Sequence, residues 1–271
     1  MKENNCNTLQ YPDNCPVSIV QLITNMTYLR KHLILLLFSF PLLVNAQEKQ
    51  SINKIGINYS VDYCYRKLAI SDPLYQQGIV WLNELENPTI GLNTGATFQH
   101  SFKNGLLVEG GLQYVRFGEK SDSISITTVD ADVAGFGVYR NKYDYIGIPI
   151  KIGYQFPLGN RIHLSVSTGI STNFFMARQY SFHYKYFDGS SGVHRETTQV
   201  GMFGTQYNQV NLVSISSIGI EIQLFKAFSV RFEPTFRYSM NPIIGDQIQV
   251  RPYSAGINTT VFYRFGMNKT N

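Results

Sequence analysis

From residue 52 onward the chain alternates apolar and polar residues with a period of two, a pattern that only an extended strand can use. In residues 55–63, every odd position carries Ile, Tyr or Val, and every even position carries Gly, Asn, Ser or Asp. Eight such segments occur, at residues 55–63, 90–99, 106–114, 143–156, 161–170, 217–224, 228–238 and 253–265. Strands with one apolar and one polar face predict an all-β, antiparallel fold.

Long and short connections alternate strictly between these segments. The long ones cover residues 64–88, 118–142, 178–207 and 240–251, and the short ones contain Asn104-Gly105, Pro157-Leu158-Gly159-Asn160 and Lys226-Ala227. An Asn-Gly pair is a strong signal for a tight hairpin. Strict alternation places every long loop at one end of a meander, as in outer-membrane barrels. We therefore predict an eight-stranded antiparallel up-and-down transmembrane β-barrel, with a bulge at Pro234, which cannot donate to the ladder.

Alternation alone does not say which face of the strands meets solvent. The charged residues on the polar faces favour an arrangement in which those faces point into the barrel. They stand among Gly and Ser rather than in a Lys/Glu-rich surface, and they are Glu109, Lys151, Glu221, Arg231, Glu233, Arg237 and Arg264. The interior of an eight-stranded barrel is just wide enough for side chains to fill it. Each charge would cost roughly 2 to 4 kcal/mol at the lipid midplane, so we predict a structural charge network in the lumen.

Aromatic residues gather near the ends of the apolar faces. The set comprises Tyr63, Tyr114, Tyr154, Tyr238, Tyr253, Tyr263 and Phe265. A tyrosine at a membrane surface keeps its ring in hydrocarbon and its hydroxyl in water, so rings of aromatics at strand ends are expected there. The alternative explanation is that tyrosine is simply a good strand former.

The composition excludes several classes of protein. Charged residues make up 15% of the chain and aromatic residues 14%, which excludes a disordered chain. Outside one short N-terminal run, no stretch approaches the roughly 18 apolar residues that a membrane-spanning helix needs, which excludes a multi-span helical protein. The net charge of +5 comes from dispersed residues, so we expect no nucleic-acid partner.

Residues 26–46 have the three parts of a secretory signal peptide. Arg30 and Lys31 precede an apolar core at residues 33–44, and small residues allow cleavage after Ala46. The alternative is a buried hydrophobic helix, which Pro41 would break and which would leave the basic flank unexplained.

The signal peptide divides the chain into three parts. Residues 1–25 form an upstream extension that need not be translated if Met26 is the start, and residues 47–271 form the mature barrel domain. Cys64 would then be the one cysteine of the mature chain and could form no internal disulfide.

Three parts of the sequence share a resemblance to one known family. They are the run Tyr143-Asp144-Tyr145-Ile146-Gly147-Ile148-Pro149-Ile150-Lys151-Ile152-Gly153-Tyr154, the segment at residues 217–221 and the aromatic end at residues 261–265. They resemble the porin-like outer-membrane β-barrel domain family that is abundant in Bacteroidota, and the resemblance covers about residues 52–266. It implies a barrel in the outer membrane of a Gram-negative bacterium, with outer-membrane lipid and the insertion machinery as partners. The sequence departs from the family after Phe265, where six further residues follow.

The sequence carries no catalytic, cofactor-binding or metal-binding motif, so we predict no enzyme, no cofactor and no metal. Some outer-membrane barrels modify lipids with a His and a Ser near the barrel rim, and His163 and Ser165 share a face here. Such a pair arises often by chance on one strand. An interior histidine is therefore the favoured interpretation.

The main hypothesis is a non-enzymatic outer-membrane barrel with a side-chain-filled lumen and long extracellular loops, in a structural or surface-interaction role. Loop 178–207 begins with aromatics at alternate positions and could bind a surface ligand by strand addition, although packing of the loop on its neighbours is the favoured interpretation. Two alternatives stay open. One is a soluble secreted lipocalin-like ligand-binding barrel with an apolar cavity, and the other is a lipid-modifying barrel enzyme.

Overall fold

The computed structural model describes residues 51–70, 73–127, 132–199, 207–245 and 248–265. The predicted upstream extension at residues 1–25 and the predicted signal peptide at residues 26–46 lie outside the described residues. Among the described residues, no helix combines the length and the apolar character that crossing a membrane would take.

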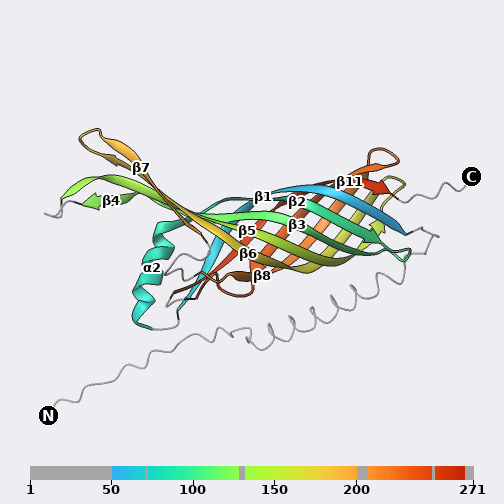
Figure 1. The fold of residues 1–271 in the computed structure, drawn as a ribbon, viewed down its shortest axis with the longest axis horizontal. Coiled ribbons are helices and arrows are strands. Elements are labelled where there is room, and N and C mark those ends of the chain that lie inside the picture. Colours follow the sequence, from blue (N-terminus) through green and yellow to red (C-terminus); the bar gives the residue numbers. More distant parts are fainter. Residues whose placement is uncertain (1–50, 71–72, 128–131, 200–206, 246–247, 266–271) are drawn as a thin grey trace, which may run out of the picture. The chain divides into compact units, whose positions relative to one another are not determined.

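The described chain consists of strands with one short helical insertion. Its elements are β1 (Ile52–Ile70), η2 (Pro73–Tyr75), α2 (Gln76–Leu85), β2 (Glu86–Ser101), β3 (Leu106–Ser121), β4 (Ile124–Thr127), β5 (Val133–Pro157), β6 (Ile162–Tyr186), β7 (Ser191–Gln199), β8 (Val210–Gln223), β9 (Phe228–Ser239), β10 (Ile244–Gly245) and β11 (Ile248–Phe265). All strand pairs are antiparallel and belong to one sheet, as the alternation predicts. Figure 1 shows the long strands side by side, with β4 and β7 extending beyond them.

Eight of the strands each pair with two others in a continuous circuit. The pairs are β1–β2, β2–β3, β3–β5, β5–β6, β6–β8, β8–β9, β9–β11 and β11–β1. The three remaining strands attach to this circuit: β4 pairs with β5, β7 with β6 and β10 with β11. The eight strands of the circuit correspond to the eight alternating segments of the sequence.

The two faces of the sheet have opposite polarity, and the apolar face is the exposed one. Ile57 is 72% exposed and Ile257 is 58% exposed, whereas Glu233 is 1% exposed. The pattern holds along β9, where exposed and buried residues alternate from Phe228 to Ser239. Apolar side chains therefore point away from the interior, and polar ones fill it.

The structure differs from the sequence prediction in its connections. The described residues form eleven strands rather than eight, because the chain remains extended through parts of three predicted loops as β4, β7 and β10. The first long loop contains α2, which the alternation did not predict. The predicted bulge at Pro234 is wrong: Pro234 pairs with Ile257 without a register shift, and β8 and β9 keep the same register on both sides of it.

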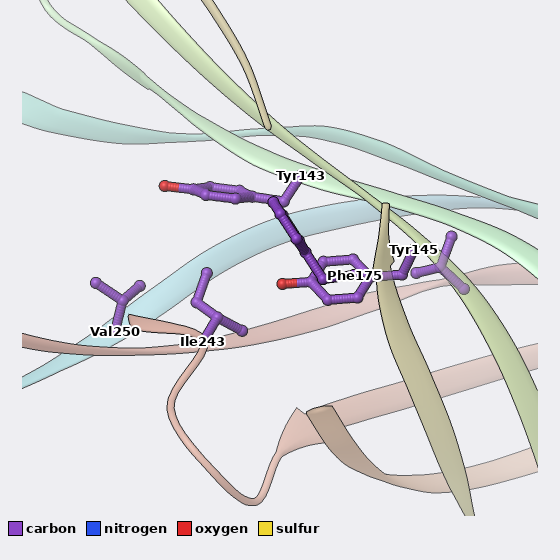
Figure 2. Packing of buried hydrophobic residues seen from close by; sticks show 6 residues of the cluster. Tyr143, Tyr145, Phe175, Ile243 and Val250 are labelled. Atoms are coloured by element: carbon purple, nitrogen blue, oxygen red, sulfur yellow. The ribbon is translucent and has the colours of Figure 1, made fainter. Parts of the chain in front are cut away.

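One apolar cluster lies within the otherwise polar interior. It consists of Val115, Tyr143, Tyr145, Phe175, Ile243 and Val250, and five of these side chains are labelled in Figure 2. The aromatic rings lie close together, with Tyr145 and Phe175 meeting edge to face at a centroid separation of 5.5 Å. These residues come from β3, β5, β6, β11 and the segment before β10, so the cluster joins distant parts of the sheet.

Candidate functional site

The interior is crossed by ion pairs between strands that share no backbone pairing. Lys54 Nζ of β1 lies 2.5 Å from Glu221 Oε1 of β8, and Arg237 Nη1 of β9 lies 2.6 Å from Asp62 Oδ2 of β1. β1 pairs only with β2 and β11 among the described strands, so neither contact follows from strand pairing. Such contacts require that the polar faces point toward a shared interior.

A four-charge cluster lies between these two pairs. Lys151 Nζ is 2.8 Å from Glu109 Oε1 and 3.2 Å from Glu233 Oε1. Arg231 Nη2 is 2.6 Å from Glu109 Oε2 and 3.3 Å from Glu233 Oε2, and its Nη1 donates to Gln99. Each cation contacts both carboxylates, so the buried charges cancel and stay hydrogen-bonded, as burial demands.

The sequence prediction identified most of these groups and missed two. Six of the seven predicted charges form buried ion pairs, whereas Arg264 is half-buried and joins no ion pair among the described residues. The missed partners are Lys54 and Asp62, which pair with Glu221 and Arg237. The polar parity of the first segment could have identified Asp62, since it stands at an even position with the other polar residues.

The cavities beside these ion pairs are small. One of about 40 Å³ adjoins Asp62 and Arg237, and another of about 40 Å³ adjoins Lys54 and Arg264. A water molecule needs roughly 10 to 15 Å³ measured this way, so each space suits a few waters rather than a ligand.

A larger cavity, of about 310 Å³, lies at the end of the interior where α2 begins and ends; we call it the outer cavity. Its polar lining consists of Arg66, Glu86, Glu119, Asn141 and Arg178, with Tyr75, Tyr143 and Tyr207 beside them; its apolar lining consists of Leu68, Leu82, Ile244, Ile248 and Val250. Tyr143 and Val250 also belong to the apolar cluster of Figure 2, and Val115 of the same cluster lines the small cavity beside Asp62 and Arg237, so the cluster contacts both cavities.

Two strand irregularities direct charged side chains into the outer cavity. In the β5–β6 pairing, Met176 is an extra residue: Tyr145 pairs with Phe175 and Asp144 with Ala177, so Arg178 faces inward opposite Tyr143. A regular strand would send Arg178 to the outer face, because side chains alternate. β-bulges re-aim side chains in this way and are enriched next to functional sites.

The second irregularity acts on β2. The β2–β3 register shifts between Pro88 and Leu92, and beyond it Glu86 is buried. On the C-terminal side of the shift, the buried positions of β2 are odd-numbered, as at Asn93, whereas Glu86 on the N-terminal side is even-numbered. The shift therefore turns Glu86 into the outer cavity.

The two carboxyl groups of the outer cavity share Arg66 and otherwise have different partners. Glu86 accepts from Tyr139 at 2.5 Å and forms an ion pair with Arg66. Glu119 accepts from Asn141 and Tyr143, both at 3.1 Å, and its Oε2 lies 3.5 Å from Arg66 Nε. Burial, together with the nearby Glu86 carboxylate, raises the pKa of Glu119 to about 7.

Of His163 and Ser165, the serine binds the neighbouring strand through its hydroxyl. The Ser165 hydroxyl donates to the Gly219 carbonyl oxygen at 3.3 Å, and His163 pairs with Glu221 in the β6–β8 register. In the part of the chain that the structure describes, no group of three His, Cys, Asp or Glu side chains could hold a metal ion.

The predicted loop 178–207 is largely a hairpin of β6 and β7. Its turn has Gly189 at φ 90°, and the Asp188 carboxylate accepts from the Ser190 backbone amide at 2.8 Å. β7 pairs with β6 alone among the described strands, so its other edge has no strand partner there. Val193 on β7 and Phe136 on β5 are each 45% exposed.

Comparison with known proteins yields distant structural likenesses only. No protein-family model matches the chain, and no curated protein matches it significantly. Ail, the attachment invasion locus protein of Yersinia pestis, solved in complex with the heparin analogue sucrose octasulfate, is 15% identical with a TM-score of 0.28, over 80% of this chain and 100% of that chain.

Two further solved structures are similar at the same level. Neisserial surface protein A is 10% identical with a TM-score of 0.38, over 79% of this chain and 99% of that chain. The N-terminal β-barrel domain of Pseudomonas aeruginosa OprF is 10% identical with a TM-score of 0.34, over 79% and 100%. At these values the likenesses assign no role, and the function must come from the chain's own residues.

Proposed function

We propose that the chain is a non-enzymatic outer-membrane protein of a Gram-negative bacterium, a closed eight-stranded transmembrane β-barrel with a structural or surface-interaction role. The inverted polarity of the sheet carries this proposal. Apolar side chains such as Ile57 and Ile257 are exposed, while ion-paired groups such as Glu233 are buried. Lipid is the solvent that favours such an arrangement, because a soluble barrel keeps its apolar faces inside.

The positions of the aromatic residues support a membrane-sized apolar band. Tyr263 pairs with Ile55 near one end of β1, and Tyr63 and Tyr65 lie eight to ten residues further along the same strand. At about 3.3 Å per residue and a tilt of about 40°, this separation is roughly 20 to 25 Å, close to the ~25 Å apolar band of outer-membrane barrels. The membrane-spanning segments are then residues 55–63 of β1 and their neighbours in register.

Charged groups on the outer face begin where this band ends. Arg116 of β3 forms an ion pair with Asp144 of β5, with Nε 2.6 Å from Oδ1, and the Tyr114 hydroxyl donates to the same oxygen. These groups stand just beyond the exposed Leu112 and the half-buried Ile146. A tyrosine followed by an ion pair fits a membrane surface facing water.

The same observations weigh against the alternative functions. A lipocalin-like barrel requires an apolar internal cavity, whereas Lys54 and Glu221 occupy the interior here. A general diffusion pore requires open cross-section, and the spaces beside the ion pairs measure about 40 Å³ each. An assignment to the porin-like family of Bacteroidota, with outer-membrane lipid and the insertion machinery as partners, fits this arrangement.

The test is the behaviour of the exported chain in cells and in bilayers. We expect it in the outer-membrane fraction, with heat-modifiable migration in gels. A spin label at Ile148→Cys, in a Cys64→Ser background, should be relaxed by oxygen dissolved in lipid, and a label at Ser167→Cys should not. Recovery from the soluble periplasm, or equal relaxation at both sites, would contradict the proposal.

The surface-interaction role is proposed for the β6–β7 hairpin, whose β7 edge could add a partner strand. Replacing residues 181–196 with a short turn should leave heat-modifiable migration intact and reduce adhesion of expressing cells to protein-coated surfaces. Unchanged adhesion of such cells, with the shortened chain properly assembled, would remove this role and leave the structural one.

A further inference from the structure

The lining of the outer cavity combines apolar and polar side chains. The apolar ones are Leu68, Ile244, Ile248 and Val250, together with Leu82 of α2. The charged and polar ones come from β1, β2, β3, β5 and β6. At about 310 Å³ the space is at the lower end of the range for small-molecule sites, which combine an apolar lining with a few converging polar groups.

The side chains of Arg66 and Glu86 already bind each other and other groups of the chain. Arg66 donates to Glu86, to Asn83 Oδ1 at 3.1 Å and to the Leu82 carbonyl oxygen at 3.1 Å. Glu86 also accepts from Tyr139. These contacts hold α2 against β1 and β2 at the edge of the outer cavity. The opposite charges of Arg66 and Glu86 cancel.

Arg178 is the charged group of the outer cavity that meets no carboxylate among the described residues, and Glu119 stands beside it, 3.5 Å from Arg66 Nε. Arg178 donates through Nε and Nη2 to Asn141 Oδ1, at 3.0 and 2.7 Å, and stacks near Tyr180 and Tyr207. Among the described residues it forms an ion pair with no carboxylate. Glu119 is buried and shares Asn141 with it.

The charges sum to one uncompensated cation when Glu119 is neutral, because Arg66 and Glu86 cancel and Arg178 remains. A single positive charge in a partly apolar lining selects a monoanion with an apolar body. A carboxylate suits the planar guanidinium, which binds it in a fork of hydrogen bonds. The two bulges direct Glu86 and Arg178 into this cavity, and β-bulges are over-represented next to functional sites.

We propose that the outer cavity binds a small amphipathic monocarboxylate, with its carboxylate on Arg178 and its apolar body against Leu68, Ile248 and Val250. Glu119 in its neutral form donates its proton in a hydrogen bond to the same carboxylate. The site is distinct from the β6–β7 hairpin edge, and binding there does not require that the strands cross a bilayer.

Affinity should fall as pH rises, because ionised Glu119 repels the bound anion. The titratable and charged groups that face Glu119 are Arg66, Glu86, Tyr139, Tyr143, Arg178 and Tyr207. Burial beside Glu119 keeps the pKa of Tyr143 above its ordinary value. Glu119 is therefore the group whose charge changes near neutral pH.

The experiment is calorimetric titration of the full mature chain in nanodiscs with three probes that share one body: phenylacetate, phenylacetamide and phenethylamine. Empty nanodiscs give the background. We expect phenylacetate to bind at millimolar or lower concentration, phenylacetamide to bind roughly tenfold more weakly or worse, and phenethylamine not to bind. Hexanoate serves as a second carboxylate with a different body.

Two variants locate the site and one serves as control. Arg178→Gln should weaken phenylacetate binding by roughly tenfold or more. Glu119→Gln should retain binding and lose its dependence on pH. Arg140→Gln removes an exposed arginine of β5 outside the cavity and should bind as the parent chain does. Heat-modifiable migration checks the fold of each variant.

Each outcome of these titrations either supports the proposal or contradicts it. No binding of phenylacetate and hexanoate to the folded parent chain, or equal binding of phenylacetate and phenethylamine, would overturn the proposal whatever the variants do. Binding that is unchanged in folded Arg178→Gln would also overturn it. Carboxylate-selective binding that Arg178→Gln abolishes and Arg140→Gln leaves alone would support it. A chain that does not enter nanodiscs would contradict the proposed function alone, and the same titration would then be made in buffer.

Discussion

Arg231 of β9 and Glu109 of β3 are 122 positions apart in the chain, yet Arg231 Nη2 lies 2.6 Å from Glu109 Oε2. β3 and β9 share no backbone pairing. Arg231 is 1% exposed and Glu109 is 4% exposed. The contact therefore links two distant walls of the sheet through the interior, where an unpaired charge would be costly.

Removing Arg231 should strongly destabilise the chain. Arg231→Met leaves Glu109 and Glu233 with Lys151 as their shared cation, and breaking a buried pair from one side costs about 3 to 5 kcal/mol. Urea unfolding in detergent micelles measures this loss. Arg161→Met, at an exposed turn, should change stability by less than about 0.5 kcal/mol. Similar losses in the free energy of unfolding for Arg231→Met and Arg161→Met would mean that the interior ion pairs contribute nothing to stability.

A charge on the outer face distinguishes lipid from water around the sheet. Ile257→Arg should cost roughly 2 to 4 kcal/mol in a bilayer, because Ile257 is exposed in the middle of the apolar band. The same change at exposed Val193 of β7 should be nearly neutral. Folding titrations into lipid vesicles provide the measurement. If Ile257→Arg is as harmless as Val193→Arg, water and not lipid surrounds the strands.

Gly105 should not tolerate a side chain. It adopts φ 89° in the β2–β3 turn, and a Cβ there would lie 2.9 Å from the Tyr154 ring and 3.0 Å from the Gln155 carbonyl oxygen. We expect Gly105→Ala to cost about 1 to 3 kcal/mol in the same urea experiment. Gly159→Ala, in the β5–β6 turn with nothing within 4 Å, is the matched control and should be neutral or slightly stabilising. Equal effects would argue against the turn geometry.

The raised pKa of Glu119 makes stability depend on pH in a defined direction. An acid whose pKa rises on folding, here from 4.5 to about 7, binds more protons in the folded state between these values. Its contribution is fully present below pH 4.5 and is lost as pH rises through about 7. Urea unfolding of the parent chain and of Glu119→Gln, at several pH values across that window, isolates the contribution.

The variant should lose this part of the slope, and Glu84→Gln on the exposed face of α2 should keep it. Parallel pH profiles for the parent chain and Glu119→Gln would show that Glu119 titrates normally.

The sequence predicts the strands and their polarity because alternation is a local property. The same parity places Glu109, Lys151 and Glu233 on one face before any contact is known. Which charges meet is not local: Lys54 finds Glu221 only through the pairing of all the strands between them.

The outer cavity was not predicted, for the same reason. Its formation depends on an extra residue at Met176 and on the register shift before Leu92, both of which exist only relative to a partner strand. If the alternation along β6 were regular, the Arg178 side chain would lie on the outer face of the sheet. The helix α2 was missed because its ten residues fall within a segment that the alternation assigns to a loop.

Residue 53 of β1 pairs with residue 265 of β11, so the first and the last of the described strands are partners. Until β11 has been synthesised, β1 has an open backbone edge and the interior charges lack part of their surroundings. The circuit of strands can therefore close only after almost the whole described chain has been made, in one late step.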